Sequence, residues 1–371
     1  AKPHMVGRPE QRPDPAFPKI ARRMRSAGVH VFPYTCALLW DVRNSSYQEA
    51  GGEAAAMRDR EGDIVMARYG GQPLAMVGPG HPAYVQLMES VMRVIMDAVE
   101  VPGVYFDMFG TSSGGCYSPL EAAWGGNVRT LGMRELGMRY KQVALNRNPH
   151  FVMWMEGNAD CYLDVVDGYI SFTGNLPVRQ ALYADYVRPF GDKSCIWLDP
   201  PHELWQPARQ FAWGAPIGRI FEHQSTRTAL NGPVDPRKVE YFRELAALRT
   251  AAIPWLAYGR MLRPLRLRNI VPAEPEPLLA GETVPSAVWK APDGSIAFVF
   301  ANGRYSTPVA FDWNADPAVY GFPGDGSAAL YRIDPGEHAQ TARRTKLQNI
   351  EGTISRREEL PAAGAMVLAI L

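Results

Sequence analysis

The chain has no long apolar run and almost no surplus of charge, and both absences exclude classes of protein. No window of its 371 residues approaches the roughly 18 uninterrupted apolar residues of a membrane-spanning helix. The formal net charge is +1 at pH 7, with no block of lysine or arginine, so we expect no nucleic-acid partner and no membrane binding. The first residues, Ala1-Lys-Pro-His, also lack the apolar core of a signal peptide.

Cysteine is scarce as well. The four cysteines are far apart and form neither a CxxC pair nor a zinc-binding pattern, so we interpret them as buried thiols and leave a disulfide open: Cys36, Cys116, Cys161 and Cys195. No GxSxG, Walker or GxGxxG motif opens a helix directly after a strand. We therefore expect no cofactor.

What the chain does have is a regular alternation of strand and helix patterns. A helix is predicted after Asp14-Pro15, with further helices over 82–100, 130–146, 158–166, 177–188 and after Asp235-Pro236. Between them lie six apolar runs that indicate buried strands: Val29–Tyr34, 103–107, 151–156, 169–172, 194–199 and 218–222.

Alternating strands and helices predict a parallel sheet with right-handed crossovers. The fold class is therefore α/β, and we expect residues 1–261 to form a (β/α)8 TIM-type barrel. Six strands are two fewer than a closed barrel needs, so the first two strands are apparently missing from this chain. A second chain or a missing N-terminal segment would then complete the barrel.

The pattern changes at about residue 262. A proline-rich segment over 263–277 leads into β-like runs, and Pro292-Asp-Gly-Ser295 has the composition of a hairpin turn. We predict that residues 262–371 form a C-terminal antiparallel β-sandwich domain.

Two of the predicted strands end on a carboxylate followed by glycine. Gly103-Val-Tyr-Phe-Asp107 leads into a glycine-rich loop, and Phe151-Val-Met-Trp-Met-Glu156 is followed by Gly157. Catalytic groups of (β/α)8 barrels lie where the strands end, and a pair of carboxylates is the basic equipment of a glycosidase. The apolar neighbours of Glu156 would raise its pKa towards the range of a general acid. Structural roles are the alternatives to catalysis: Asp107 could cap a helix from the end of its strand, and Glu156 could lie in the first turn of a helix.

Further residues are candidates for binding a sugar. Asp199 ends the fifth predicted strand, and Asp41 follows Trp40 near the first. Aromatic rings next to the carboxylates could support a sugar ring, although core packing explains such rings equally well; the candidates are Trp40, Tyr105, Trp154 and Trp197. His202, Glu203 and His223 suggest a metal site only weakly, because their spacing fits no helical zinc motif. We therefore predict no metal.

These motifs resemble those of retaining α-glycoside hydrolases built on (β/α)8 barrels. The resemblance rests on the Asp107 strand, on Glu156-Gly-Asn-Ala-Asp160 and on the β-sandwich tail, and it is strongest to uncharacterised bacterial and endo-α-N-acetylgalactosaminidase-like proteins. It implies that Asp107 is the nucleophile on strand 4 and Glu156 the acid/base on strand 5. Amylases carry an arginine two residues before the nucleophile, where this chain has Tyr105. The resemblance also favours an extracellular or periplasmic location.

We therefore expect a retaining glycoside hydrolase that cleaves α-linked sugars in an oligosaccharide or glycoconjugate by double displacement. One alternative is a catalytically silent carbohydrate-binding or structural barrel protein assembled with a partner chain. The other is a metal-dependent hydrolase.

Overall fold

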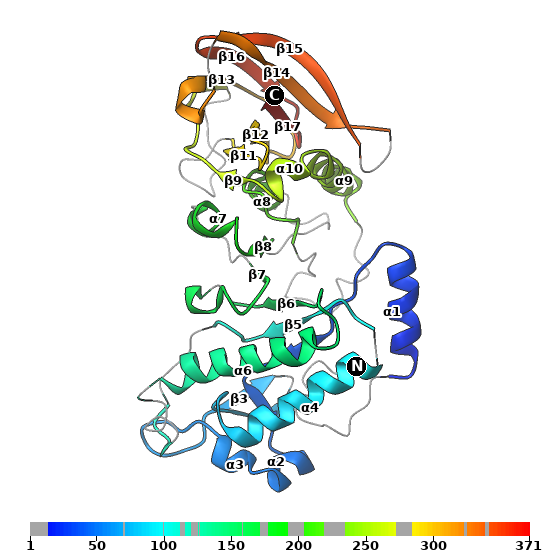
Figure 1. Cartoon of the computed structure of the whole chain (residues 1–371), viewed down its shortest axis with the longest axis vertical. Coiled ribbons are helices and arrows are strands. Elements are labelled where there is room, and N and C mark those ends of the chain that lie inside the picture. The colour runs from blue at the N-terminus through cyan, green and yellow to red at the C-terminus, as the bar shows by residue number, and fades with distance from the viewer. Residues whose placement is uncertain are drawn as a thin grey trace. The chain divides into compact units, whose positions relative to one another are not determined.

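The computed structural model describes most of the chain and divides it by contacts into two units, residues 1–170 and residues 171–371 (Figure 1). Each unit is considered by itself below. The described residues are 14–69, 71–98, 100–111, 116–119, 125, 127–157, 159–170, 177–191, 204–218, 234–271, 284–322, 325–337 and 341–371. The predicted boundary between residues 261 and 262 differs from this division and stays a prediction.

The first unit opens with the predicted helix, α1 (Ala16–Ser26). The Asp14 carboxylate accepts a hydrogen bond from the backbone N–H of Ala16 at 2.8 Å, and Gly28 follows the helix with a φ of 78°. The apolar face that the sequence predicts is only partly covered, because Ala21 is buried whereas Ile20 is 53% exposed.

The core of the first unit is a parallel sheet. Its strands β1 (Tyr34–Cys36), β5 (Gly103–Asp107), β6 (Val152–Met155) and β7 (Gly168–Ile170) pair in that order. The strand predicted over Val29–Tyr34 is therefore wrong in its bounds, since pairing begins only at its end. Pro33 has no N–H to donate and contributes only its carbonyl, which accepts from Tyr105 at 3.0 Å.

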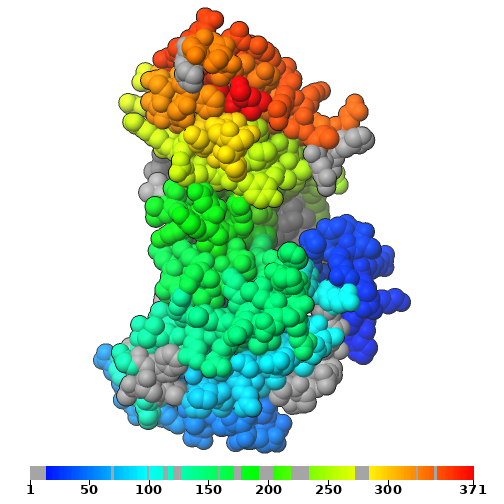
Figure 2. All heavy atoms as spheres, in the orientation of Figure 1, coloured from blue at the N-terminus to red at the C-terminus, as the bar shows by residue number. Residues whose placement is uncertain are grey.

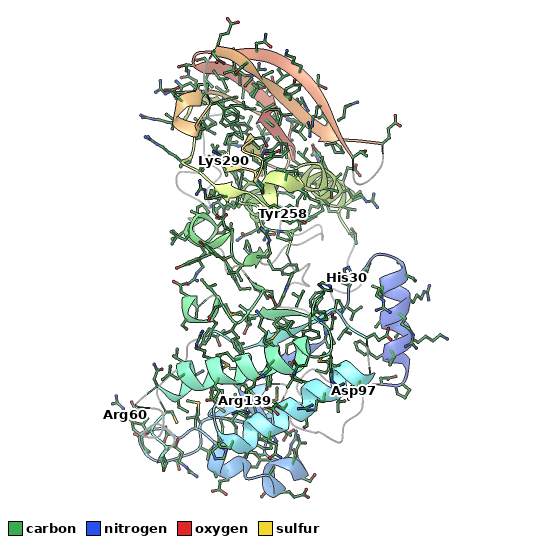
Figure 3. The ribbon with its side chains drawn as sticks, viewed as in Figure 1. His30, Arg60, Asp97, Arg139, Tyr258 and Lys290 are labelled. Atoms are coloured by element: carbon green, nitrogen blue, oxygen red, sulfur yellow. The ribbon has the colours of Figure 1, made fainter. Side chains whose placement is uncertain are left out.

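Two long helices lie side by side along one face of this sheet, α4 (Pro82–Ala98) and α6 (Val128–Leu145) (Figure 1). Ion pairs join them at the surface. Arg139 of α6 lies 3.6 Å from Glu89 of α4, and Arg147 pairs with Asp97 (Arg139 and Asp97 are labelled in Figure 3). The helices predicted over 82–100 and 130–146 are thus confirmed. The helix predicted over 158–166 is wrong, because its described part forms only a short 3-10 helix.

The polar stretch after the first strand forms a small substructure of its own. Strands β2 (Leu39–Asp41), β3 (Met66–Tyr69) and β4 (Gln72–Met76) make an antiparallel sheet in the order β2-β4-β3. The short helices α2 (Ser45–Glu49) and α3 (Gly52–Ala55) precede β3, and the 3-10 helix η1 (Asp160–Tyr162) lies between β6 and β7.

The second unit is mostly antiparallel β-structure. One sheet has the order β15-β14-β17-β12-β11-β9 and the other β10-β13-β16. In chain order their strands are β9 (Arg260–Met261), β10 (Leu267–Val271), β11 (Ser286–Lys290), β12 (Ile296–Ala301), β13 (Val309–Ala315), β14 (Asp325–Pro335), β15 (Ala342–Glu351), β16 (Ile354–Leu360) and β17 (Ala365–Ile370). The predicted hairpin between β11 and β12 is confirmed, with Gly294 at a φ of 93°.

Helices cover the outer face of the larger sheet. They are α8 (Trp205–Ala212), α9 (Pro236–Ala251) and α10 (Ile253–Leu256), and their apolar residues share one core with this sheet. The second core lies between the two sheets, where Phe298 and Trp313 have ring centroids 4.9 Å apart. Little of the red β17 reaches the face drawn in Figure 2, which agrees with the burial of all its residues. The predicted helix at Asp235-Pro236 is confirmed: the Asp235 carboxylate accepts from the backbone N–H of Arg237 at 2.9 Å.

Other predictions fare differently. The helix predicted over 177–188 is shorter in the structure, where it forms α7 (Val178–Tyr183), and the short strand β8 (Arg188–Phe190) follows it. The second unit also contains the 3-10 helix η4 (Pro317–Tyr320), between β13 and β14. The strand predicted over 194–199, and residues 219–222 of the last one, lie outside the described residues. A closed barrel is not seen in the described part of the chain.

The packing of α6 gives a test of the fold. A Cβ atom on Gly132 would lie 2.6 Å from the backbone nitrogen of Gly80, so Gly132→Ala must push the helix away. Alanine favours a helix over glycine by about 1 kcal/mol, but overpacking costs about 1–3 kcal/mol. We expect a lower midpoint of thermal unfolding for Gly132→Ala. Met138→Ala, at a 53% exposed position of the same helix, is the control and should change the midpoint little. An unchanged or higher midpoint for Gly132→Ala would contradict the packing.

Candidate active site at the ends of strands β5 and β6

The two predicted catalytic carboxylates lie at the same end of neighbouring strands. Strands β5 and β6 run parallel with Tyr105 opposite Trp154 and Phe106 opposite Met155, and Asp107 and Glu156 are the next residues. The backbone N–H of Glu156 donates to the Phe106 carbonyl at 2.9 Å, which continues the pairing to this level. The register thus delivers both carboxylates to the carboxyl edge of the sheet, where parallel sheets bind their ligands.

Side-chain alternation sets the face on which these residues project. Phe106 is fully buried and stacks on Tyr140 of α6, with ring centroids 5.0 Å apart. Since successive side chains of a strand point to opposite faces, Tyr105 and Asp107 project away from the helices. The same alternation applies to β6, where Met155 is buried and Glu156 is only half-buried.

A backbone hydrogen bond ties Glu156 to the loop after β5. The N–H of Met108 donates to Oε2 of Glu156 at 2.9 Å. Met108 has a φ of 60°, a left-handed conformation that is costly for a residue with a side chain. The strained residue therefore directs its N–H at the carboxylate and fixes the orientation of Glu156 beside Asp107.

Two glycines allow the loops after β5 and β6 to touch. A Cβ atom on Gly157 would lie 2.1 Å from the carbonyl carbon of Gly110, so no other residue fits at this position. The N–H of Gly157 donates to the Phe109 carbonyl at 2.8 Å, and Gly110 has a φ of 76°. The glycine that follows each carboxylate in the sequence is thus explained by close backbone contact.

Tyr34 is a site residue that the sequence reasoning missed. It lies opposite Tyr105 on the neighbouring strand β1, and its hydroxyl donates a hydrogen bond to Oδ2 of Asp107. Burial, and then this hydrogen bond, raise the pKa of Tyr34 well above its ordinary value, so the hydroxyl stays protonated and remains a donor. The signal available in the sequence was the position of Tyr34 at the carboxyl end of a predicted strand, because the carboxyl ends of parallel strands, including the one that ends at Asp107, lie at the same edge of a sheet.

Cys36 lies in the same row of the sheet, opposite Asp107. Its side chain is 2% exposed, and burial raises the pKa of the thiol to about 12. The negative charges of Asp107 and Glu156 contribute to this raised pKa as well, which reflects the closeness of the two carboxylates to one buried thiol.

Of the predicted aromatic contacts, two flank the carboxylates on their own strands. Tyr105 packs against Tyr34 with ring centroids 5.9 Å apart, and Trp154 packs against Phe32 at 5.3 Å. Both rings are half-buried. Tyr105 and Trp154 therefore lie beside the carboxylates and retain some exposed surface.

Trp40 and Asp41 occupy positions that favour structural roles. Trp40 is fully buried and donates its indole N–H to the hydroxyl of Ser46 at 3.1 Å. The Asp41 carboxylate is 9% exposed and accepts two hydrogen bonds from the Arg43 guanidinium, at 3.0 and 2.8 Å. A buried ring offers no face to a sugar, so we do not carry Trp40 into the proposal below.

The remaining predicted residues cannot be placed, since they lie outside the described residues. They are Asp199 and Trp197, together with the three residues considered for a metal: His202, Glu203 and His223. Among the residues that are described, no group of three histidine, cysteine, aspartate or glutamate side chains could hold a metal ion. No helix in the described part of the chain is long and apolar enough to cross a membrane.

Comparisons with known proteins show which family model and which curated protein this chain resembles. A protein-family model described as "Domain of unknown function (DUF6259)" matches residues 9–192, which include Asp107 and Glu156. "Putative glycoside hydrolase 22789" from Monosiga brevicollis is 23% identical, in a match that covers 81% of this chain. The chain spans only 28% of the length of that curated relative.

Solved structures show the same fold at low sequence identity. The maltogenic α-amylase AmyB from Thermotoga neapolitana has a TM-score of 0.54 and 13% identity, covering 95% of this chain and 80% of that one. The GH27 β-L-arabinopyranosidase from Geobacillus stearothermophilus has a TM-score of 0.57 and 8% identity, covering 98% and 79%. The fold is thus an α/β fold with parallel and antiparallel sheets, similar to that of glycoside hydrolases. The likeness to endo-α-N-acetylgalactosaminidases stays a prediction.

The thiols provide a test of the site's burial. In the described residues Cys36 and Cys116 are buried free thiols, whereas Cys161 is exposed, against the prediction that it is buried. Because the reactive form is the thiolate, Cys36 should resist iodoacetamide at pH 8 while Cys161 is alkylated. Peptide mapping by mass spectrometry measures the alkylation of both cysteines, and unfolding in guanidinium should make Cys36 reactive. Rapid labelling of Cys36 in the native chain would contradict the buried position beside Asp107.

Proposed function

We propose that this chain is a retaining glycoside hydrolase acting on α-linked sugars in an oligosaccharide or glycoconjugate. The observation that carries the proposal is the pairing of β5 with β6, which brings Asp107 and Glu156 to one edge of the sheet on the face away from the helices. The similarity to a protein named as a glycoside hydrolase, and to solved glycosidase folds, supports the class of reaction.

In this proposal Asp107 is the nucleophile and Glu156 the acid/base. The Asp107 carboxylate attacks the anomeric carbon while Glu156 protonates the leaving oxygen, which gives a glycosyl ester on Asp107. Glu156 then takes a proton from water, and the water displaces Asp107 from the sugar. The Met108 N–H keeps Glu156 oriented through both steps by binding its Oε2.

Tyr34 holds the nucleophile. Amylases place an arginine two residues before the nucleophile, and here that position is Tyr105. A hydroxyl donor from the adjacent strand, Tyr34, binds Oδ2 of Asp107 instead. The hydrogen bond fixes the rotamer of Asp107, so that its other oxygen, Oδ1, can attack. Tyr105 and Trp154, on the same strands as the carboxylates, are proposed to contact the sugar.

The proposal also concerns the edge strand of the sheet. Among the described strands of the first unit, β1 pairs only with β5, so its other edge has no described neighbour. An open edge in a parallel sheet is a site for adding a strand. We propose that strands from a partner chain pair there and complete the barrel.

The roles of the two carboxylates can be separated with three variants. Asp107→Asn keeps the shape of the side chain but removes the nucleophile, so kcat on aryl α-glycosides should fall by several orders of magnitude. Glu156→Gln should slow substrates with poor leaving groups by about 10²–10⁴-fold, while activated aryl glycosides keep their first step. Azide should partly restore turnover of Glu156→Ala, since it attacks the glycosyl ester without a general base.

The matched control is Glu135→Gln, because the side chain of Glu135 is 43% exposed and lies on α6, on the other side of the sheet. It should have the activity of the unmodified chain. A cyclophellitol-type epoxide that labels Asp107, located by mass spectrometry, would support the nucleophile directly. If both carboxylate variants retain full activity on a proven substrate, or the label lies elsewhere, the mechanism is wrong. A chain that binds sugars without hydrolysing any would favour the silent binding protein.

A separate prediction concerns Tyr34→Phe. A hydrogen bond to a charged group contributes about 1.5–3 kcal/mol, so its loss should lower kcat about 10- to 100-fold if Tyr34 orients the attacking carboxylate. KM should change little, because the substrate does not depend on this bond for its own contacts. Tyr186→Phe, at a position 79% exposed, is the matched control. Unchanged kcat in Tyr34→Phe would remove the positioning role.

A further inference from the structure

A hollow in the second unit has the features of a second binding site. It lies on the three-stranded sheet β10-β13-β16 and has a volume of about 400 Å³. This is within the range of sites that bind small ligands. Its lining combines polar and apolar surface, with Trp313 beside three arginines, two asparagines, a serine and an aspartate.

Strand register explains why these groups gather on the outer face of the sheet. On β13, Phe311 and Trp313 point into the core between the two sheets, so Asp312 and Asn314 point outward. Asp312 lies opposite Arg268 on one side and opposite Arg357 on the other, which makes a row of two cations around one anion.

The single carboxylate of this row is already occupied. Arg357 donates to Oδ1 of Asp312 at 3.1 Å, and the Asn269 amide donates to Oδ2 at 2.5 Å. The amide hydrogen bond, and then the guanidinium, lower the pKa of Asp312, so the carboxylate stays charged. Arg268 pairs with Asp312 through the strand backbone, but its side chain makes no hydrogen bond or ion pair with any residue that the structure describes. The hollow thus keeps positive charge that its own aspartate does not neutralise.

A strained residue fixes the edge of the hollow. Asn269 has a φ of 48°, and the pairing of β10 with β13 shifts register between Arg268 and Val271. The bulge lets Asn269 reach Asp312 while the preceding Arg268 remains in the row. Strain of this kind persists where the surrounding structure holds it, here through the hydrogen bond to Asp312.

Neutral hydrogen-bonding groups lie next to the cations. Asn314 and Ser355 face each other across β13 and β16, and both are exposed. Neither side chain makes a hydrogen bond to another described residue. An amide and a hydroxyl can each donate and accept, which suits the hydroxyl groups of a sugar ring. The guanidinium groups suit a carboxylate or sulfate, whose oxygens they bind in pairs.

We propose that this hollow binds an acidic saccharide, a uronic acid or sulfated sugar residue. Its anionic group pairs with Arg268 and Arg357, and its ring hydroxyls bind Asn314 and Ser355. The choice of a sugar as the ligand rests on the proposed glycosidase function, whereas the preference for an anion rests on the charges of the hollow. The site would hold an acidic glycan on the second unit, independently of the carboxylate pair.

The test is calorimetric binding of a galacturonic acid trisaccharide to the full chain. The chain carries Asp107→Asn so that turnover cannot remove the probe. Arg268→Ala removes a side chain with no described structural bond, and we expect binding to weaken about 10- to 100-fold. Asn314→Ala should weaken it by a smaller factor. Arg344→Ala, an exposed arginine on β15, is the matched control and should leave the affinity unchanged.

Maltotriose and sodium sulfate decide between the alternatives. We expect maltotriose and sulfate to bind with lower affinity than the trisaccharide. We also expect the affinity for the trisaccharide to fall as ionic strength rises. Equal binding of maltotriose would overturn the role of charge, and equal binding of sulfate would reduce the hollow to a simple anion site. Unaltered affinity in Arg268→Ala, or no binding at all, would overturn the proposal. Hydrolysis by the unmodified chain is measured separately, so failure of one proposal does not obscure the other.

Discussion

The contact between the loops that follow β5 and β6 is the constraint on which the candidate site depends. Gly157 lies against the backbone of Gly110 so closely that a Cβ atom has no room. This approach allows the Met108 N–H to reach Glu156. Without it the paired strands would still deliver both carboxylates to one edge of the sheet, but Glu156 would lose the hydrogen bond that orients it beside Asp107.

The sheet itself contributes by sorting side chains between its faces. Phe106 and Met155 fill the interface with the helices, so the residues next to them in sequence must point the other way. Apolar packing on one face of the sheet thereby directs the Asp107 and Glu156 side chains to the opposite face. Few of the residues that position the carboxylates are themselves acidic or basic. Packing and backbone geometry fix most of the arrangement.

The comparison of sequence and structure shows which physical signals are local. Asp107 and Glu156 were predicted because an apolar run followed by one carboxylate and a glycine is readable within a few residues. The helix at Asp235 was predicted for the same reason, since its cap lies in adjacent residues. Tyr34 was missed because its partner lies 73 residues away, and only the parallel pairing of β1 with β5 brings the two together.

Errors in the predictions have equally specific causes. The strand at Val29–Tyr34 was placed too early, because an apolar run does not show where hydrogen bonding starts and Pro33 delays it. The burial of Trp40 disfavours the predicted sugar contact, which hydrophobicity alone could not reveal because it does not tell a buried ring from an exposed one, and Ser46 satisfies the only polar atom of this ring. The exposure of Cys161 was missed because a small thiol carries no periodic pattern that reveals its face.

The order of strands in the larger sheet of the second unit has a consequence for how this unit folds. Strand β17 lies between β14 and β12, although it follows both in the chain, and all its residues are buried. During synthesis the edge of β12 that later pairs with β17 therefore stays without a partner, with six apolar residues in the strand, until β17 has left the ribosome. Apolar strands without charge are prone to aggregate while they wait. The late synthesis of one central strand therefore leaves the apolar edge of β12 unpaired until the last residues of the second unit are made.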